Sequence, residues 1–369
     1  MHGRAGTVIE KLRGELDESL FRPADPAALR IRGREALLVL VPFLVLAAAL
    51  QLLRAGPEDS LKALFAEDGT IFLGGALTHG TLDSLTTPYP EYLVFLPRLI
   101  AELATIVPLR FAPEAMNLCA VLLVAVSALA VWVASAGLIR TTWLRAVLVA
   151  LVLLPPASGL ETVVSTTNVI WYTTFAVFWL LLWRPETTRG AVLAALLILA
   201  AGLSSPTFLF FAPLAALRAI AVRDRRDGLI VGAFALAAAI QLPVTLLAES
   251  PFETEPMWSA SVLTTFLQRV VAGSALGLEL GGEAWAEWGW TFLVLISLAV
   301  AAALAALAAR ASAGRLFALV AVATAVVMFL ASGYQRALGP AMVWYEGGYN
   351  SLGGRYAMVP ALLIASAAL

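Results

Sequence analysis

Long apolar runs separated by short polar clusters fill the sequence from residue 35 to its end. The runs are about 15–24 residues long, the length at which an α-helix crosses the hydrocarbon core of a bilayer. The pattern predicts about ten transmembrane helices, at residues 36–53, 114–137, 145–158, 168–183, 189–203, 206–222, 228–248, 288–309, 315–332 and 356–369. We therefore expect an all-α, polytopic membrane protein.

A polar leader, residues 1–34, precedes the first apolar run and carries seven Lys and Arg residues. It is too long and too charged for the n-region of a signal peptide, so we expect the first span to remain as an anchor. Ile9, Leu12, Leu16 and Leu20 recur at helical spacing. Two alternatives stay open for the leader: a short amphipathic helix on the cytoplasmic surface, or a disordered tail.

The distribution of charge predicts the orientation of the chain. With the N-terminus in the cytoplasm, 17 of the 24 Lys and Arg residues lie on the cytoplasmic side, as the positive-inside rule requires. This topology places three long loops outside, at residues 54–113, 249–287 and 333–355. Because sites are commonly built on long loops over a rigid scaffold, we expect any chemistry on the outer face of the cell membrane.

Two further apolar stretches, 91–109 and 262–280, are assigned to the outer surface as juxtamembrane helices. If they crossed the membrane, the charge asymmetry downstream would reverse. Residues 35–369 then form a single transmembrane domain with these outer loops. The final run, 356–369, spans only about 14 residues, less than a full crossing, which leaves open whether the protein continues beyond Leu369.

Composition removes several functional classes. The chain is 61% hydrophobic and 13% charged with a net charge of -1, and no basic stripe suited to nucleic acid is present in the sequence. One cysteine and two histidines make a haem or a zinc-finger site improbable, so a bound divalent cation would need oxygen ligands. The sequence contains no phosphate-binding P-loop motif for a nucleotide. Span interiors carry almost no ionisable groups, which weakens an ion-coupled transporter reading.

Two adjacent carboxylates, Glu67 and Asp68, follow the first span and lead an apolar helical segment. Near the membrane a carboxylate is desolvated, which raises its pKa towards the range of a general base. The alternative is structural: Asp68 caps the following helix and Glu67 interacts with the positive end of its dipole.

Arginines near the outer surface are candidates for binding a phosphate-bearing lipid, since guanidinium binds phosphate oxygens in a fork. Arg98 and Glu102 are spaced i, i+4 in the 91–109 stretch, so a self-contained ion pair is the alternative. Arg336 and Arg355 flank the last outer loop, where snorkelling to phospholipid is the competing explanation.

Polar and aromatic residues meet at the outer turn between the third and fourth spans. Glu161, Asn168, Trp171 and Tyr172 have the character needed to bind a sugar, although aromatics at this depth also form the ordinary interfacial belt. A carbohydrate groove is also plausible among the outer-loop residues Trp258, Trp285, Trp288, Trp290, Trp344, Tyr345, Glu253, Glu255, Glu283 and Glu287.

This arrangement resembles the GT-C superfamily, the integral membrane glycosyltransferases that use polyprenyl-phosphate sugars. The likeness rests on an amino-terminal span, an outer loop opening with Glu67-Asp68-Gly69, the surface helix Tyr92-Leu93-Val94-Phe95-Leu96-Pro97-Arg98, and a late Arg355-Tyr356. It covers most of the chain as a pattern, and its motifs are short. Unlike larger relatives, the sequence shows no carboxy-terminal soluble domain, which leaves acceptor recognition open.

The resemblance implies an inverting transferase in which an acidic residue of the first outer loop is the base or a metal ligand. Carried over, Asp68 is the base, with Phe72 four residues on, while Glu67 supports it or joins it in binding a divalent cation. Arg98 and Arg355, with Tyr356, would hold the lipid phosphate.

The expected function is therefore transfer of a sugar from a polyprenyl-phosphate donor to a glycan, lipid or protein acceptor on the extracytoplasmic side. The main alternative is a flippase or carrier of lipid-linked sugars, in which the arginines bind phosphate, the acidic pair is a helix cap and no bond forms. A purely structural membrane partner is a third possibility, which the large outer loops make less attractive.

Overall fold

The computed structural model describes residues 2–23, 34–56, 61–221, 224–248, 260–310, 312–335 and 353–369. Throughout these ranges the regular structure is helical, apart from one isolated bridge between Pro23 and Arg184. The all-α prediction is thus confirmed for the described chain.

Each predicted apolar run coincides with a helix. These are α2 (Arg34–Ala55), α6 (Ala112–Ala134), α7 (Thr142–Leu153), α8 (Val169–Leu182), α9 (Thr188–Gly202), the 3-10 helix η6 (Pro206–Phe211) with α10 (Ala212–Ala221), α11 (Arg225–Leu247), α13 (Gly273–Arg310), α14 (Ser312–Gln335) and α16 (Gly354–Ala368). Short 3-10 helices lie between them: η3 (Leu109–Phe111), η4 (Ser135–Gly137) and η5 (Leu160–Thr162).

Five helical stretches of the described residues are long and apolar enough to cross a membrane: Leu38–Ala55, Leu109–Gly137, Arg225–Leu247, Ser261–Ala306 and Gly314–Tyr334. The other apolar helices of these ranges have 10–17 residues. Because long apolar helices need lipid or protein around them, this pattern indicates a membrane-embedded protein.

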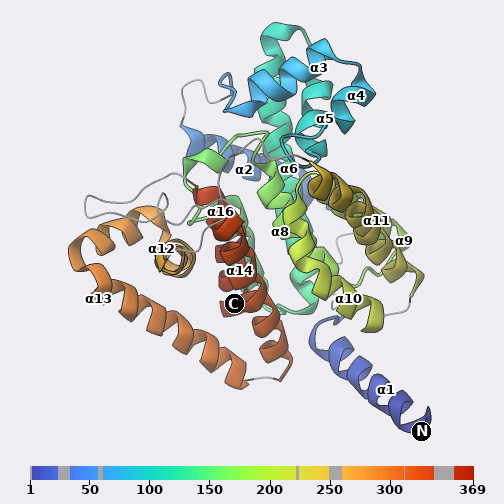
Figure 1. Ribbon diagram of the computed structural model, residues 1–369, viewed down its shortest axis with the longest axis vertical. Coiled ribbons are helices and arrows are strands. Elements are labelled where there is room, and N and C mark those ends of the chain that lie inside the picture. The colour runs from blue at the N-terminus through green and yellow to red at the C-terminus, as the bar shows by residue number, and fades with distance from the viewer. Residues whose placement is uncertain are drawn as a thin grey trace.

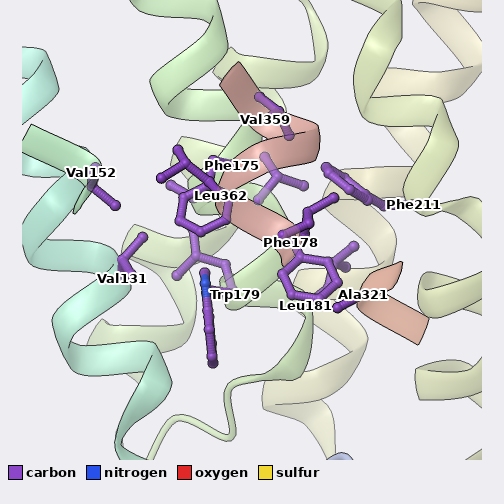
Figure 2. Close-up of a cluster of buried hydrophobic side chains, with 14 of the residues drawn as sticks. Val131, Val152, Phe175, Phe178, Trp179, Leu181, Phe211, Ala321, Val359 and Leu362 are labelled. Carbon is purple, nitrogen blue, oxygen red and sulfur yellow. The ribbon is translucent and has the colours of Figure 1, made fainter. Parts of the chain in front are cut away.

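Helix α8 is the central helix of the bundle. All of its residues are buried, which a helix that is apolar on every side requires. Figure 2 shows Phe175, Phe178 and Trp179 of α8 among apolar side chains from the helices around it. These include Val131 of α6, Val152 of α7, Phe211 of η6, Ala321 of α14, and Val359 and Leu362 of α16.

Helix α1 (His2–Ser19) lies at one end of the molecule (Figure 1). Leu16 is buried, as are Leu20 and Phe21 just beyond the helix. Arg184 Nη1 contacts Asp17 Oδ1 at 2.6 Å, and Arg13 Nε donates to the carbonyl oxygen of Ile220 at 3.1 Å. Of the two alternatives for the leader, residues 2–19 therefore form the helix, and it packs on α10 and α14. Residues 24–33 of the leader lie outside the described ranges.

Buried arginines hold helix ends near α1. Arg145 Nη2 donates to the carbonyl oxygen of Trp132 at 2.7 Å, close to the last turn of α6. Arg218 Nη1 donates to the carbonyl oxygen of Leu181 at 2.6 Å in the last turn of α8, and its Nη2 pairs with Asp227 at 2.5 Å. Because the last carbonyls of a helix have no intrahelical partner, these guanidinium groups satisfy them.

The opposite end of the molecule carries the predicted first outer loop, described from residue 61 to residue 113 (Figure 1). It contains the π-helix η2 (Asp68–Leu73), α3 (Gly74–Thr78), α4 (Thr81–Thr86) and α5 (Phe95–Ala104). Helix α5 has 10 residues, about 15 Å at 1.5 Å per residue, so the 91–109 stretch forms no crossing helix.

The 262–280 stretch is also helical but is not separate from the span that follows it. It comprises α12 (Ala260–Thr265), the π-helix η7 (Phe266–Ala272) and the start of α13. Within α13 the backbone is non-helical at Gly277 (φ 78) and Gly289 (φ 53). The predicted span at 288–309 therefore begins at a glycine break inside a longer helical stretch.

Candidate functional site

A cavity of about 410 Å³ lies where the first outer loop meets the ends of the central helices. Its charged lining residues are Glu67, Glu91 and Arg355. The other lining residues are aromatic, polar and uncharged, or apolar: Phe72, Tyr89, Pro90, Tyr92, Val94, Thr167, Asn168, Ile170, Trp171, Ser205, Pro206, Thr207, Leu209, Phe210, Thr245, Ser332 and Tyr356. A concave site with a few convergent polar groups among apolar walls is the usual form of a small-molecule site.

Glu67 reaches this cavity because of the backbone just before it. Ala66 has a φ of 45, a left-handed conformation that is uncommon for a residue other than glycine. The preceding segment is anchored by Asn117 of α6, whose Nδ2 donates to the carbonyl oxygens of Leu61 and Ala63 at 2.8 Å each. Glu67 Oε2 is buried and has no hydrogen-bond partner within the described residues.

Asp68 is turned away from the cavity and is fully buried. Its carboxylate accepts hydrogen bonds from the backbone N–H of Thr166 at 2.9 Å, and from the N–H and the hydroxyl of Thr167 at 2.7 and 2.5 Å. Burial raises the pKa of Asp68, and the donors on Thr167 and Thr166 oppose that rise. Asp68 therefore joins η2 to the segment that enters α8, and Thr167 of that segment lines the cavity.

Arg355 lines the cavity from the start of α16. The backbone N–H of Arg355 donates to Glu161 Oε1 at 2.6 Å, so Glu161 supplies a carboxylate to the helix N-terminus. Burial raises the pKa of Glu161, while Arg355 and Arg269 oppose that rise. Glu161 does not line the cavity, whereas Glu67 is close enough to Arg355 for an electrostatic interaction.

Of the four predicted sugar-binding residues, Asn168 and Trp171 line the cavity, whereas Glu161 and Tyr172 do not. Trp171 and Tyr356 both line the cavity, with their ring centroids 5.5 Å apart in an edge-to-face arrangement. Asn168 also lines it, but its amide donates to the carbonyl oxygen of Glu161 at 2.7 Å and accepts from the indole N–H of Trp171 at 3.2 Å. Tyr172 is buried outside the lining, and its hydroxyl donates to the carbonyl oxygen of Thr162 at 3.2 Å. Asn168 and Tyr172 thus hold their own loop.

Arg98, which the resemblance predicts to hold the lipid phosphate, does not line the cavity. It is buried and outside the cavity lining, with its guanidinium carbon 5.8 Å from the centroid of the Phe72 ring. Its electrostatic partner is Asp83, and the buried Oε1 of Glu102 has no hydrogen-bond partner in the described chain. The predicted Arg98–Glu102 pair is therefore not formed, because tertiary packing turns Arg98 under Phe72.

The segment from Tyr89 to Val94 forms a wall of the cavity, and Tyr92, Leu93 and Val94 precede α5 instead of belonging to the predicted surface helix. Gln241 of α11 holds this wall: Leu93 N–H donates to Gln241 Oε1, and Gln241 Nε2 donates back to the carbonyl oxygen of Leu93, each at 3.2 Å. Ser204 Oγ accepts from the Leu96 N–H at 2.9 Å. The sequence signals were a lone glutamine inside an apolar run and the prolines that flank Tyr89.

Glu67 and Asp68, the predicted ligands of a divalent cation, do not both line the cavity. Both oxygens of Asp68 already accept hydrogen bonds from Thr166 and Thr167, so only Glu67 of the pair is directed to the cavity. Across the described ranges, no three His, Cys, Asp or Glu side chains are grouped closely enough to hold a metal ion. Among the described residues that line the cavity, Arg355 carries the positive charge that a bound phosphate could use.

Several outer-loop residues of the sequence analysis lie outside the described ranges: Glu253, Glu255, Trp258, Arg336, Trp344 and Tyr345. Trp285 and Trp290 are described and pack edge to face with ring centroids 5.6 Å apart. Neither of them lines the cavity, and neither do Trp288, Glu283 and Glu287.

Comparison of the chain with protein-family models, with curated proteins and with solved structures gives no match. The fold and the site define a class of protein: it is membrane-embedded, it is helical throughout the described ranges, and the described residues that line its cavity include one arginine and two carboxylates.

Proposed function

We propose that the protein is a membrane glycosyltransferase of GT-C type that moves a sugar from a polyprenyl-phosphate donor to an acceptor hydroxyl. In this proposal the chain crosses the cell membrane ten times, its N-terminus is cytoplasmic and the cavity faces outward. The single observation that carries it is the approach of Glu67 and Arg355 in one cavity between aromatic walls. A carboxylate beside an arginine supplies both groups that this transfer requires.

The reaction follows from their chemistry. Glu67 takes the proton of the acceptor hydroxyl. The oxygen of that hydroxyl then uses an electron pair to form a bond to the anomeric carbon of the sugar. The bond between that carbon and the phosphate oxygen breaks on the opposite side, so the configuration inverts. The negative charge that grows on the leaving phosphate lies beside Arg355, whose fixed guanidinium stabilises it.

The general base is assigned to Glu67 in place of Asp68 for two reasons. Glu67 lines the cavity and has a carboxylate oxygen without a hydrogen-bond partner in the described chain. Asp68 has three donors on its carboxylate and no surface on the cavity. Since a base must reach the proton that it abstracts, geometry favours Glu67.

The test is Glu67→Gln in proteoliposomes supplied with a labelled polyprenyl-phosphate sugar. Loss of a general base lowers the rate by about 10²–10⁴-fold. Glu279→Gln is the matched control, because it makes the same chemical change at an exposed residue outside the cavity. Undiminished transfer by Glu67→Gln would remove this residue from the mechanism.

A carrier of lipid-linked sugars is the rival function, because a cavity with one arginine also suits a bound lipid phosphate. The two are separated in detergent, where no compartment exists and net translocation cannot be observed. A new glycosidic bond formed by purified protein under these conditions supports the transferase. Binding of the donor without product there supports the carrier.

A further inference from the structure

We infer that Glu161 is a positioning residue: by accepting the backbone N–H of Arg355, it fixes the direction in which the Arg355 guanidinium enters the cavity. The inference rests on the proposed function for the role of Arg355, which is to bind the leaving phosphate. Glu161 itself does not line the cavity. Its influence on a bound phosphate therefore passes through Arg355.

Helix α16 has no capping side chain at its own N-cap position. It begins at Gly354, and the residue before it is Gly353, which has a left-handed backbone (φ 71). Arg355 lies in the first turn, where backbone N–H groups have no acceptor within the helix. Glu161 Oε1 takes the N–H of Arg355 at 2.6 Å from 194 positions away in the sequence. A carboxylate at this place both satisfies a donor and favours the positive end of the helix dipole.

The loop that carries Glu161 is itself fixed. Arg54 Nη2 donates to the carbonyl oxygens of Pro155 and Gly159 at 3.2 and 3.1 Å. Val164, three residues after Glu161, has a φ of 47, a conformation rare for a β-branched residue. Such strain persists only where the surrounding structure determines it, and it clusters at functional sites. Glu161 is therefore a defined point of attachment for α16.

The first turn of α16 lies directly on this loop. A Cβ atom added to Gly354 would stand 2.8 Å from the carbonyl oxygen of Ser158, so the two backbones touch at a place where only glycine fits. Next to Arg355, Tyr356 packs edge to face on Trp171. Because Arg355 stands between these two contacts, a small movement of the turn against the loop displaces its guanidinium within the cavity.

Glu161 could act on Arg355 through its reach or through its charge, since it is close enough to Arg355 and Arg269 for an electrostatic interaction with both. Two conservative substitutions separate these effects. Glu161→Asp keeps the charge but shortens the side chain by about 1.5 Å, so the hydrogen bond to the Arg355 N–H is lost. Glu161→Gln keeps an acceptor oxygen at full reach and removes the charge. Positioning by the hydrogen bond requires that Asp be the more damaging of the two.

Binding of farnesyl phosphate to the purified full chain in detergent at pH 7, followed by titration calorimetry, tests this. The probe carries the monophosphate that leaves in the proposed reaction. Arg355→Gln should weaken binding about 30-fold, because a charge-assisted contact is lost. Glu161→Asp should weaken it about tenfold, a usual effect of losing a helix cap, and Glu161→Gln less than about threefold. Glu279→Asp, the same change at an exposed residue outside the cavity, should bind as the wild type does.

The double variant Glu161→Asp/Arg355→Gln decides whether Glu161 acts through Arg355. If it does, the double variant should bind about as weakly as Arg355→Gln alone, because no guanidinium is left to position. Independent effects would multiply to about 300-fold and would overturn the inference. Unchanged binding by Glu161→Asp or by Arg355→Gln would also overturn it, as would a greater loss in Glu161→Gln than in Glu161→Asp.

Transfer kinetics with a labelled polyprenyl-phosphate sugar separate this inference from the proposed function. Negative charge on the phosphate grows in the transition state, so Glu161→Asp should lower kcat about tenfold and change KM less than about threefold. Coupled loss of binding together with this kinetic pattern supports both. Coupled loss of binding in a protein that forms no glycosidic bond supports the positioning role and contradicts the transferase. Transfer by the wild type with independent binding effects overturns the inference and leaves the transferase standing.

Discussion

Replacing Gln241 by methionine tests how the Tyr89–Val94 wall is held. The side chain is fully buried and exchanges two hydrogen bonds with the backbone of Leu93. Methionine has a similar volume and makes neither bond. An unpaired buried polar group costs about 1–3 kcal/mol. The variant leaves two such groups, the N–H and the carbonyl oxygen of the half-buried Leu93, and should therefore lower the free energy of unfolding by about 2–3 kcal/mol.

Hydrogen exchange localises the effect. About 2 kcal/mol corresponds to about 30-fold in an equilibrium constant, so the peptide covering residues 89–96 should exchange about 30-fold faster in the variant. Leu236→Met, at an exposed position of the same helix, is the control and should leave this peptide unchanged. Unchanged exchange in Gln241→Met would refute the reasoning, because the contacts of Leu203 and Ser204 would then suffice to hold the wall.

Two further predictions concern buried charges. The pKa of Asp68 is raised chiefly by burial, so its contribution to stability is full below its ordinary pKa of about 4 and is lost as the pH rises through the raised value. The stability of the wild type relative to Asp68→Asn, followed by thermal unfolding, should therefore fall from pH 4 to pH 7; a rise would mean that the Thr166 and Thr167 donors outweigh burial. Arg218→Met leaves the carboxylate of Asp227 buried and unpaired and should cost about 3–5 kcal/mol. Chemical denaturation measures it, and a double variant with Asp227→Leu should recover part of the loss.

The positions of the helices were predictable because bilayer-length apolar runs encode them directly. Every predicted run between residues 36 and 369 coincides with a helix. The packing of α1 on the other helices was harder to predict from the sequence, because the spacing of Leu16 and Leu20 was compatible with both a helix and a disordered tail. Burial of these residues depends on α10 and α14, which are distant in the sequence.

The choice between Glu67 and Asp68 was beyond the sequence for a geometric reason. Adjacent residues of a helix point about 100° apart, so one of the two can face the cavity while the other faces the core. Which one does so depends on the left-handed turn at Ala66 and on the threonine donors nearly a hundred residues away. The i, i+4 spacing of Arg98 and Glu102 did not reveal the contacts of Arg98 either, because Asp83 and Phe72 approach it from other segments of the chain.

The arginines at the α1 end have a consequence for biogenesis. Arg145 and Arg218 direct their guanidinium groups to oxygens of the same chain, so neither is available to a phospholipid headgroup. Lysine at either position would keep the positive charge that an insertion machinery reads, but it would offer a single ammonium where a planar fork is needed. A single Arg→Lys substitution at position 145 or 218 can thus separate the insertion of this polypeptide into the bilayer from the packing of its helices against one another.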